Sequence, residues 1–320
     1  MALIDDQLKA LKFESPQYIP VRVSLLPATW MKYGDRLGEL VEKHPSLFPD
    51  KGKKCGVYDE VTGKYVEGEA VDEWGCVWNN VEEGMCGLVT GHPIARREDI
   101  RSLQPPTEVI DSHPHGFMFL RIFDLRGFEE AMIDFAEEPP ELQTLIDMVC
   151  DYNMKCLEKR LPLHEGPIIN FGDDNGMQNA LPISPAKWRK YFKPAYAKIF
   201  GRCRREGLFV YMHTDGCIHE IIGDFIECGV NVINPQIRAN GLDNLVRVAK
   251  GKVCIDLDLD RQMFPFCRPE EIDPHVRECI EALGSPEGGL WLLAECAPDV
   301  PLDTIDAICN ALEKYRGYFS

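Results

Sequence analysis

The sequence predicts an α/β protein whose parallel strands close into a single (β/α)8 barrel, also called a TIM barrel. Four times in the second half of the chain, a helical pattern ends at a glycine and a short apolar strand follows. Glycine tolerates the left-handed geometry that ends helices, and near-continuous apolar strands are typical of a parallel sheet buried on both faces. No GxGxxG or GxxxxGK(S/T) phosphate loop follows a strand, so the barrel is favoured over an open doubly wound sheet. These four strands are expected at residues 208–213, 230–234, 252–256 and 290–294.

Three more strands are expected earlier in the chain, at residues 17–26, 116–122 and 166–171. Helices are expected between strands, for example where Ser184 offers an N-cap and Pro185 occupies the first helical position. The aromatic stripe that follows, within residues 188–199, is interpreted as core. Residues 44–115 show no clear period, so we expect a long irregular insertion there, with a small hairpin around residues 56–67.

Length and composition narrow the class of protein. A (β/α)8 barrel needs roughly 250 residues, so a chain of 320 residues is expected to form one domain over residues 1–320. The formal net charge of −17 argues against nucleic acid and anionic membranes as partners. There is no signal-peptide pattern and no long apolar span, so we expect a cytoplasmic protein whose 13 cysteines are reduced thiols. A homodimer is expected on general grounds alone.

Polar side chains follow the ends of the predicted strands, where parallel barrels place their active sites. These residues are Asp173 and Asp174, His213 and Asp215, Asp260, and Glu295 and Cys296. Because parallel strands direct their carboxyl ends to one face, we expect these side chains to meet at one mouth. The candidate catalytic residues are Asp174, His213 and Asp173.

Each of these residues also has a plain structural alternative. Either aspartate suits the cap of a following segment, His213 suits a buried core position, and Cys296 suits the role of a small hydrophobic residue. His113 and His115 have a spacing typical of metal ligands, but they lie in the irregular half of the chain.

Two chemistries use such a set of residues. In the first, His213 and Asp215 bind zinc, with Cys296 and Glu295 as rivals for a further position; zinc accepts imidazole, thiolate and carboxylate ligands. The metal acts as a Lewis acid on a substrate heteroatom. In the second there is no metal, and Asp174 and His213 transfer protons.

An ordered series of short motifs runs along the chain. The motifs are DEWGCVW (72–78), FGDDNGMQ (171–178), ISPAKWRKYFKP (183–194), YMHTDG (211–216), CGVNVINPQ (228–236), DRQ (260–262), GG (288–289) and PDVPLD (298–303). This series resembles the uroporphyrinogen decarboxylase superfamily from about residue 70 to the end, and the first motif resembles its methyltransferase-type members. The resemblance implies a (β/α)8 barrel. Within or beside these motifs, the residues expected to bind substrate are Gln178, Asn170, Asp260 and Trp78.

The superfamily contains decarboxylases of tetrapyrrole synthesis and cobalamin-dependent methyltransferases. The decarboxylases carry an N-terminal Arg-Gln-Ala-Gly-Arg motif that residues 30–36 lack, so metal-free decarboxylation is the alternative function. The methyltransferases place zinc on a His-x-Cys pair and a later Cys, and His213 with Asp215 matches the pair with Asp in place of Cys. The resemblance therefore implies zinc-assisted transfer of a methyl group from a small O-methyl substrate, in particular an aryl methyl ether. The implied acceptor is the Co(I) corrinoid of a separate protein, because a single barrel leaves no room in the 320-residue chain for a corrinoid domain.

Overall fold

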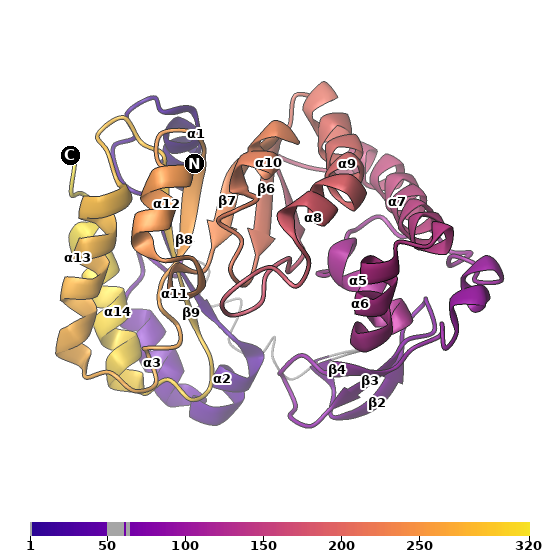
Figure 1. Cartoon of the computed structure of the whole chain (residues 1–320). Helices are drawn as coiled ribbons and strands as arrows, with labels where there is room; N and C mark the ends of the chain where they lie inside the picture. The colour runs from indigo at the N-terminus through magenta and orange to yellow at the C-terminus, as the bar shows by residue number, and fades with distance from the viewer. Residues whose placement is uncertain (1, 50–60, 62–64) are drawn as a thin grey trace. The chain divides into compact units, whose positions relative to one another are not determined.

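The structure is a computed structural model that describes residues 2–49, 61 and 65–320. The chain folds into two compact units (Figure 1). The first unit comprises Met1–Glu69, Asn79–Leu88 and Gln236–Ser320, and the second comprises Ala70–Trp78 and Val89–Pro235. The expectation of one domain over residues 1–320 stays a prediction.

The first unit contains three parallel strands in the order β1-β9-β8, separated along the chain by helices. The strands are β1 (Val21–Leu25), β8 (Cys254–Asp258) and β9 (Leu290–Cys296). The helices are α1 (Ala2–Lys12), α2 (Pro27–Tyr33), α3 (Asp35–Lys43), α11 (Ile237–Asn240), α12 (Leu242–Val248), α13 (Ile272–Leu283) and α14 (Leu302–Tyr315), with a 3-10 turn at Pro269–Glu271. Helices α13 and α14 lie side by side (Figure 1).

The second unit contains three further parallel strands, in the order β7-β6-β5. The strands are β5 (Ile168–Gly172), β6 (Phe209–Thr214) and β7 (Val230–Pro235). The helices are α5 (Phe119–Arg126), α6 (Phe128–Glu137), α7 (Pro140–Arg160), α8 (Pro185–Tyr191), α9 (Lys193–Arg205) and α10 (Ile222–Glu227), with 3-10 turns at Arg97–Arg101 and Leu161–Leu163. The expected α/β architecture of parallel strands alternating with helices is confirmed, and all six of these strands lie at predicted positions.

The region expected to be an irregular insertion, residues 44–115, contains a small three-stranded sheet. Its strands, in the order β2-β3-β4, are β2 (Gly68–Val71), β3 (Val77–Asn80) and β4 (Leu88–Gly91). The hairpin expected around residues 56–67 falls largely outside the described residues.

One predicted strand is wrong. Residues 116–122 form a turn and the start of helix α5, in which Phe119 and Ile122 are buried. A helix start that is apolar on every side lacks the 3.6-residue alternation that distinguishes a helix from a buried strand. The helix begins here because the Asp173 carboxylate accepts hydrogen bonds from successive backbone amides, at 3.0 Å from Met118 and from Leu120.

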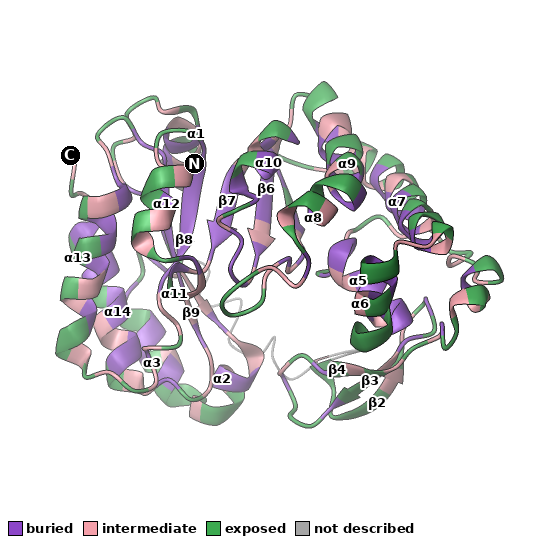
Figure 2. Cartoon of the chain, in the orientation of Figure 1, coloured by how far each residue is buried: buried purple, intermediate pink, exposed green. Residues whose placement is uncertain are grey.

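The aromatic stripe on α8 and α9 is core, as expected (Figure 2). Its largest side chains, Trp188 and Tyr196, are completely buried and stack at 5.7 Å between ring centroids. Ser184 caps α8, since its hydroxyl accepts a hydrogen bond from the Lys187 amide. The described cysteines are free thiols. Within the described part of the chain, no helix is long and apolar enough to cross a membrane.

Replacing Asp173 with Asn tests its role in starting α5. The variant leaves buried amides without a charged acceptor, and each loss costs roughly 1–3 kcal/mol. We expect Asp173→Asn to lower the free energy of unfolding in urea by at least about 3 kcal/mol. Ser184→Ala, which removes one exposed cap, is the matched control at about 1 kcal/mol. Equal effects of the two variants would contradict the assignment.

Candidate functional site

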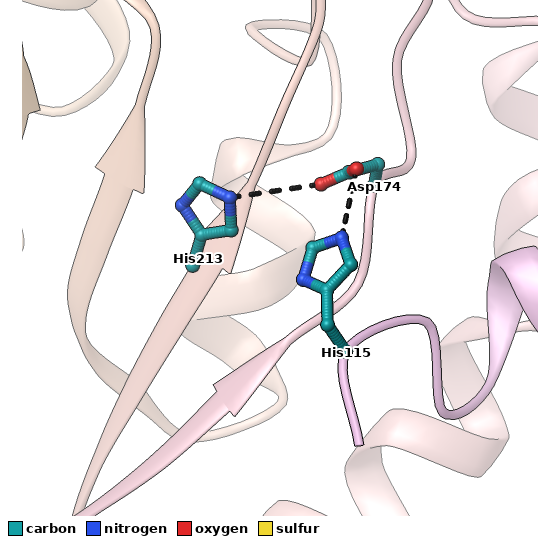
Figure 3. A group of neighbouring side chains, drawn as sticks. All are labelled: His115, Asp174 and His213. Atoms are coloured by element: carbon teal, nitrogen blue, oxygen red, sulfur yellow. Dashed lines mark hydrogen bonds and ion pairs between the residues drawn. The ribbon is translucent and has the colours of Figure 1, made fainter. Parts of the chain in front are cut away.

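Three ionisable side chains meet at the carboxyl ends of β5 and β6 in the second unit (Figure 3). Asp174 follows β5, His213 lies near the end of β6, and His115 comes from the segment before α5. The Asp174 carboxylate lies 2.9 Å from His115 Nε2 and 3.8 Å from His213 Nε2. One potential ligand atom from each residue lies within 4.8 Å of the other two. The structure therefore brings the predicted pair Asp174 and His213 together and adds His115.

Asp215 joins this cluster from the loop after β6. Its carboxylate lies 3.4 Å from His213 Nε2, and its backbone amide donates a hydrogen bond of 2.9 Å to Asp174. The pairing of His213 with Asp215, predicted from sequence, is thus present in the geometry. On the other side of the His213 ring, Nδ1 lies 2.7 Å from Asn234 Oδ1.

Glycines create the space in which these side chains approach. Gly172 pairs with His213 across β5 and β6, and a Cβ atom at Gly172 would lie only 2.8 Å from His115 Nδ1. In the loops beyond the strands, Gly216 has φ +82° and packs directly on the Gly176 backbone. A side chain at either of the paired loop glycines would push apart the segments that carry Asp174 and Asp215.

The adjacent carboxylates Asp173 and Asp174 have different environments. Asp173 is completely buried; burial raises its pKa, and hydrogen bonds from the Leu120 and Phe119 amides and from Tyr196 oppose that rise. These contacts are those of a structural cap, and a catalytic role for Asp173 stays a prediction. For Asp174, burial alone would raise the pKa, but the hydrogen bond and charge of His115, the charge of His213 and the Asp215 amide together hold it below its usual range. Asp174 is therefore ionised at neutral pH.

The two histidines of the His113-Pro-His115 sequence have separate roles. His113 Nε2 donates to the Asn153 carbonyl at 3.1 Å, and its Nδ1 accepts from Arg160 at 3.3 Å. Burial lowers the pKa of His113 to about 4, and the charge of Arg160 adds to that effect. His113 is thus a neutral structural histidine. From the sequence alone, His113 and His115 share one ligand-like spacing, so the spacing does not show which of the two histidines belongs to the cluster.

Cys296 and Glu295, the rivals for a further zinc position, lie at the end of β9 in the first unit. Cys296 is completely buried, and burial raises the pKa of its thiol far above the ordinary value. Glu295 forms an ion pair with Arg261. Their participation in a metal site stays a prediction.

A pocket of about 740 Å³ lies beside these residues in the first unit. Its lining includes Arg238, Arg261, Met263, Phe266, Glu295 and Asp299. Both guanidinium groups are already paired: Arg238 with Asp260 at 2.7 Å, and Arg261 with Asp258 at 3.2 Å as well as with Glu295. Asp260, expected to bind substrate, is therefore held by an arginine at the edge of the pocket.

The other residues expected to bind substrate lie in the second unit. Gln178 is exposed in the loop after β5, and Asn170 is exposed on β5. The Trp78 indole donates to Asp72 at 3.1 Å, and Asp72 also pairs with Arg121. The roles of Gln178, Asn170 and Trp78 in substrate binding stay predictions.

A family model described as uroporphyrinogen decarboxylase matches residues 123–315, which is more than half of the chain. The chain belongs to the uroporphyrinogen decarboxylase family. This membership agrees with the observed α/β fold of barrel type, and the superfamily includes both decarboxylases and corrinoid methyltransferases. Members of this superfamily are enzymes.

No curated protein sequence matches the chain significantly. Among solved structures, it is similar to dihydropteroate synthase from Xanthomonas albilineans with 4-aminobenzoic acid, at 12% sequence identity and a TM-score of 0.32. The similarity covers 51% of this chain and 55% of that chain, and it has no bearing on function.

The low pKa of His113 predicts a pH dependence of stability. The pKa of His113 in the folded protein, about 4, lies below the ordinary 6.5. The contribution of neutral His113 to the stability of the fold is therefore complete above pH 6.5 and is lost as the pH falls from there towards 4. Between pH 7 and pH 5 we expect the free energy of unfolding to fall by about 2 kcal/mol more in the wild type than in His113→Gln. The exposed His92→Gln is the control. Parallel pH profiles for wild type and His113→Gln would refute the assignment.

Proposed function

We propose that this family member is a methyltransferase that moves the methyl group of a small O-methyl compound, in particular an aryl methyl ether, to the Co(I) corrinoid of a separate protein. The observation that carries the proposal is the cluster of His115, Asp174 and His213, which suits a zinc ion. The proposal also includes a cytoplasmic location and a homodimer.

The donor types of the cluster fit zinc. Imidazole nitrogens and a carboxylate oxygen are its ordinary ligands, and three protein ligands with one open position are typical of catalytic sites. Tetrahedral zinc places its ligand atoms roughly 3.3 Å apart, so the described atoms, which lie within 4.8 Å of one another, need only a small contraction. Asp215, at 3.4 Å from His213 Nε2, is an alternative carboxylate ligand for one of these three positions.

Each residue has a definite task in this proposal. Zinc at this place would supply Lewis acidity to the ether oxygen of the substrate. Asp174, which is ionised and lies 2.9 Å from His115 Nε2, would hold the metal, and it does not serve as a general acid at neutral pH. Gly172 provides the space that lets the His115 ring reach Asp174.

Charge pairing argues against the decarboxylase alternative. A porphyrinogen substrate carries many carboxylates, which a site recognises with available guanidinium groups. In the first unit, Arg22, near the start of β1, pairs with Asp256 on β8 at 2.7 Å, and Arg238 and Arg261 are paired as described above. Binding a polycarboxylate there would require breaking these ion pairs.

The central test combines metal analysis with a methyl-transfer assay. Protein purified without chelator should contain zinc, and incubation with a reduced corrinoid protein and a panel of methoxylated compounds should produce the methylcobalt spectrum for at least one compound. His213→Ala should lose both the zinc and the spectral change. Full methyl transfer in the presence of chelator would refute the proposal that the reaction needs zinc. Absence of transfer with every compound would favour decarboxylation or another methyl donor.

A glycine variant tests the cluster without changing any ligand. In Gly172→Ala the new methyl group would lie 2.8 Å from His115 Nδ1 and displace the ring. We expect zinc affinity, measured by competition with a chelator, to fall at least about tenfold. Gly201→Ala, where a Cβ atom meets only the flexible end of Arg205 at 3.9 Å, is the control and should bind zinc normally. Unchanged affinity in Gly172→Ala would show that His115 is not a ligand.

A further inference from the structure

The second ring nitrogen of His213 has a buried partner whose role the proposed metal site leaves unassigned. Asn234 Oδ1 lies 2.7 Å from His213 Nδ1. Asn234 is near the end of β7, it is only 1% exposed, and the parallel register of β6 and β7 places it directly beside His213. Backbone pairing, rather than a mobile loop, therefore fixes this contact.

The chemistry of this contact selects one form of the imidazole. An amide oxygen only accepts hydrogen bonds, so a neutral His213 ring satisfies it by carrying its proton on Nδ1. The lone pair then resides on Nε2, which is the atom that faces Asp174 at 3.8 Å and Asp215 at 3.4 Å. The opposite tautomer would place the Nδ1 lone pair 2.7 Å from the lone pairs of the amide oxygen, which disfavours it roughly tenfold or more.

We propose that Asn234 is a positioning residue that holds neutral His213 as the Nδ1–H tautomer and thereby presents Nε2 as its ligand atom. The tautomer is a property of this chain alone, whereas its consequence for metal binding rests on the proposed function.

The tautomer can be measured directly in metal-free protein. With nitrogen-15-labelled histidine at mildly alkaline pH, where imidazole is neutral, the ring nitrogen shifts of His213 show which nitrogen carries the proton. Comparison with His213→Gln assigns the signal. We expect the proton on Nδ1 in wild type and in Asn234→Asp, which keeps an acceptor, and a shift towards Nε2–H in Asn234→Leu. A wild-type proton on Nε2, or an unchanged tautomer in Asn234→Leu, would overturn the inference.

Zinc affinity gives a second readout that does not involve turnover. We expect Asn234→Leu to bind zinc about 10- to 100-fold more weakly than wild type in chelator competition. Asn234→Asp should restore most of the affinity at mildly alkaline pH. Asn310→Leu, an exposed asparagine on α14, is the matched control and should bind as wild type does. If Asn234→Leu does not fold, Asn234→Ala removes the same acceptor with less bulk.

The outcomes separate this inference from the proposed function. Normal zinc binding by a folded Asn234→Leu variant overturns the inference and leaves the metal proposal intact. If the wild-type protein binds no zinc, the zinc proposal is refuted. The tautomer measurement alone then decides the role of Asn234.

Discussion

The candidate site depends on the hydrogen-bonded register of three parallel strands. The pairing of β5, β6 and β7 places Gly172, His213 and Asn234 in one row across the sheet. The glycine leaves room for the His115 ring on one side, and the asparagine supplies a hydrogen-bond acceptor on the other. A slip of one residue would turn His213 to the opposite face of the sheet. The backbone pattern of the sheet therefore determines which polar side chains can meet.

Two neighbouring carboxylates, Asp173 and Asp174, have different surroundings. Asp173 is withdrawn from solvent and accepts backbone amides at the start of α5, and this fixes the segment that supplies His115. Asp174 is one-quarter exposed and faces the two imidazoles. The Asp173 carboxylate thus helps to place the segment that carries His115.

The sequence predicted the parallel strands and two members of the cluster because both leave local signals. Apolar runs after glycines mark buried strands, and polar residues at strand ends mark the face where Asp174 and His213 lie. His115 could not be assigned in this way, since its spacing from His113 is shared by both residues and only the contacts of His113 with Asn153 and Arg160 distinguish them. The start of α5 was predicted as a strand because burial on every side hides the helical period.

The balance of charge connects metal binding to the reaction. Asp174 is held ionised, so it cannot give a proton to a leaving oxygen at neutral pH. Asp174 therefore offers neither a proton nor a positive charge to stabilise a new negative charge. A methyl ether nevertheless needs such stabilisation, because its oxygen acquires negative charge as the methyl group departs. A divalent cation bound by Asp174 and the imidazole lone pairs would neutralise the carboxylate and stabilise the negative charge on the ether oxygen. The metal proposal and the methyl-transfer proposal therefore depend on the same electrostatic requirement.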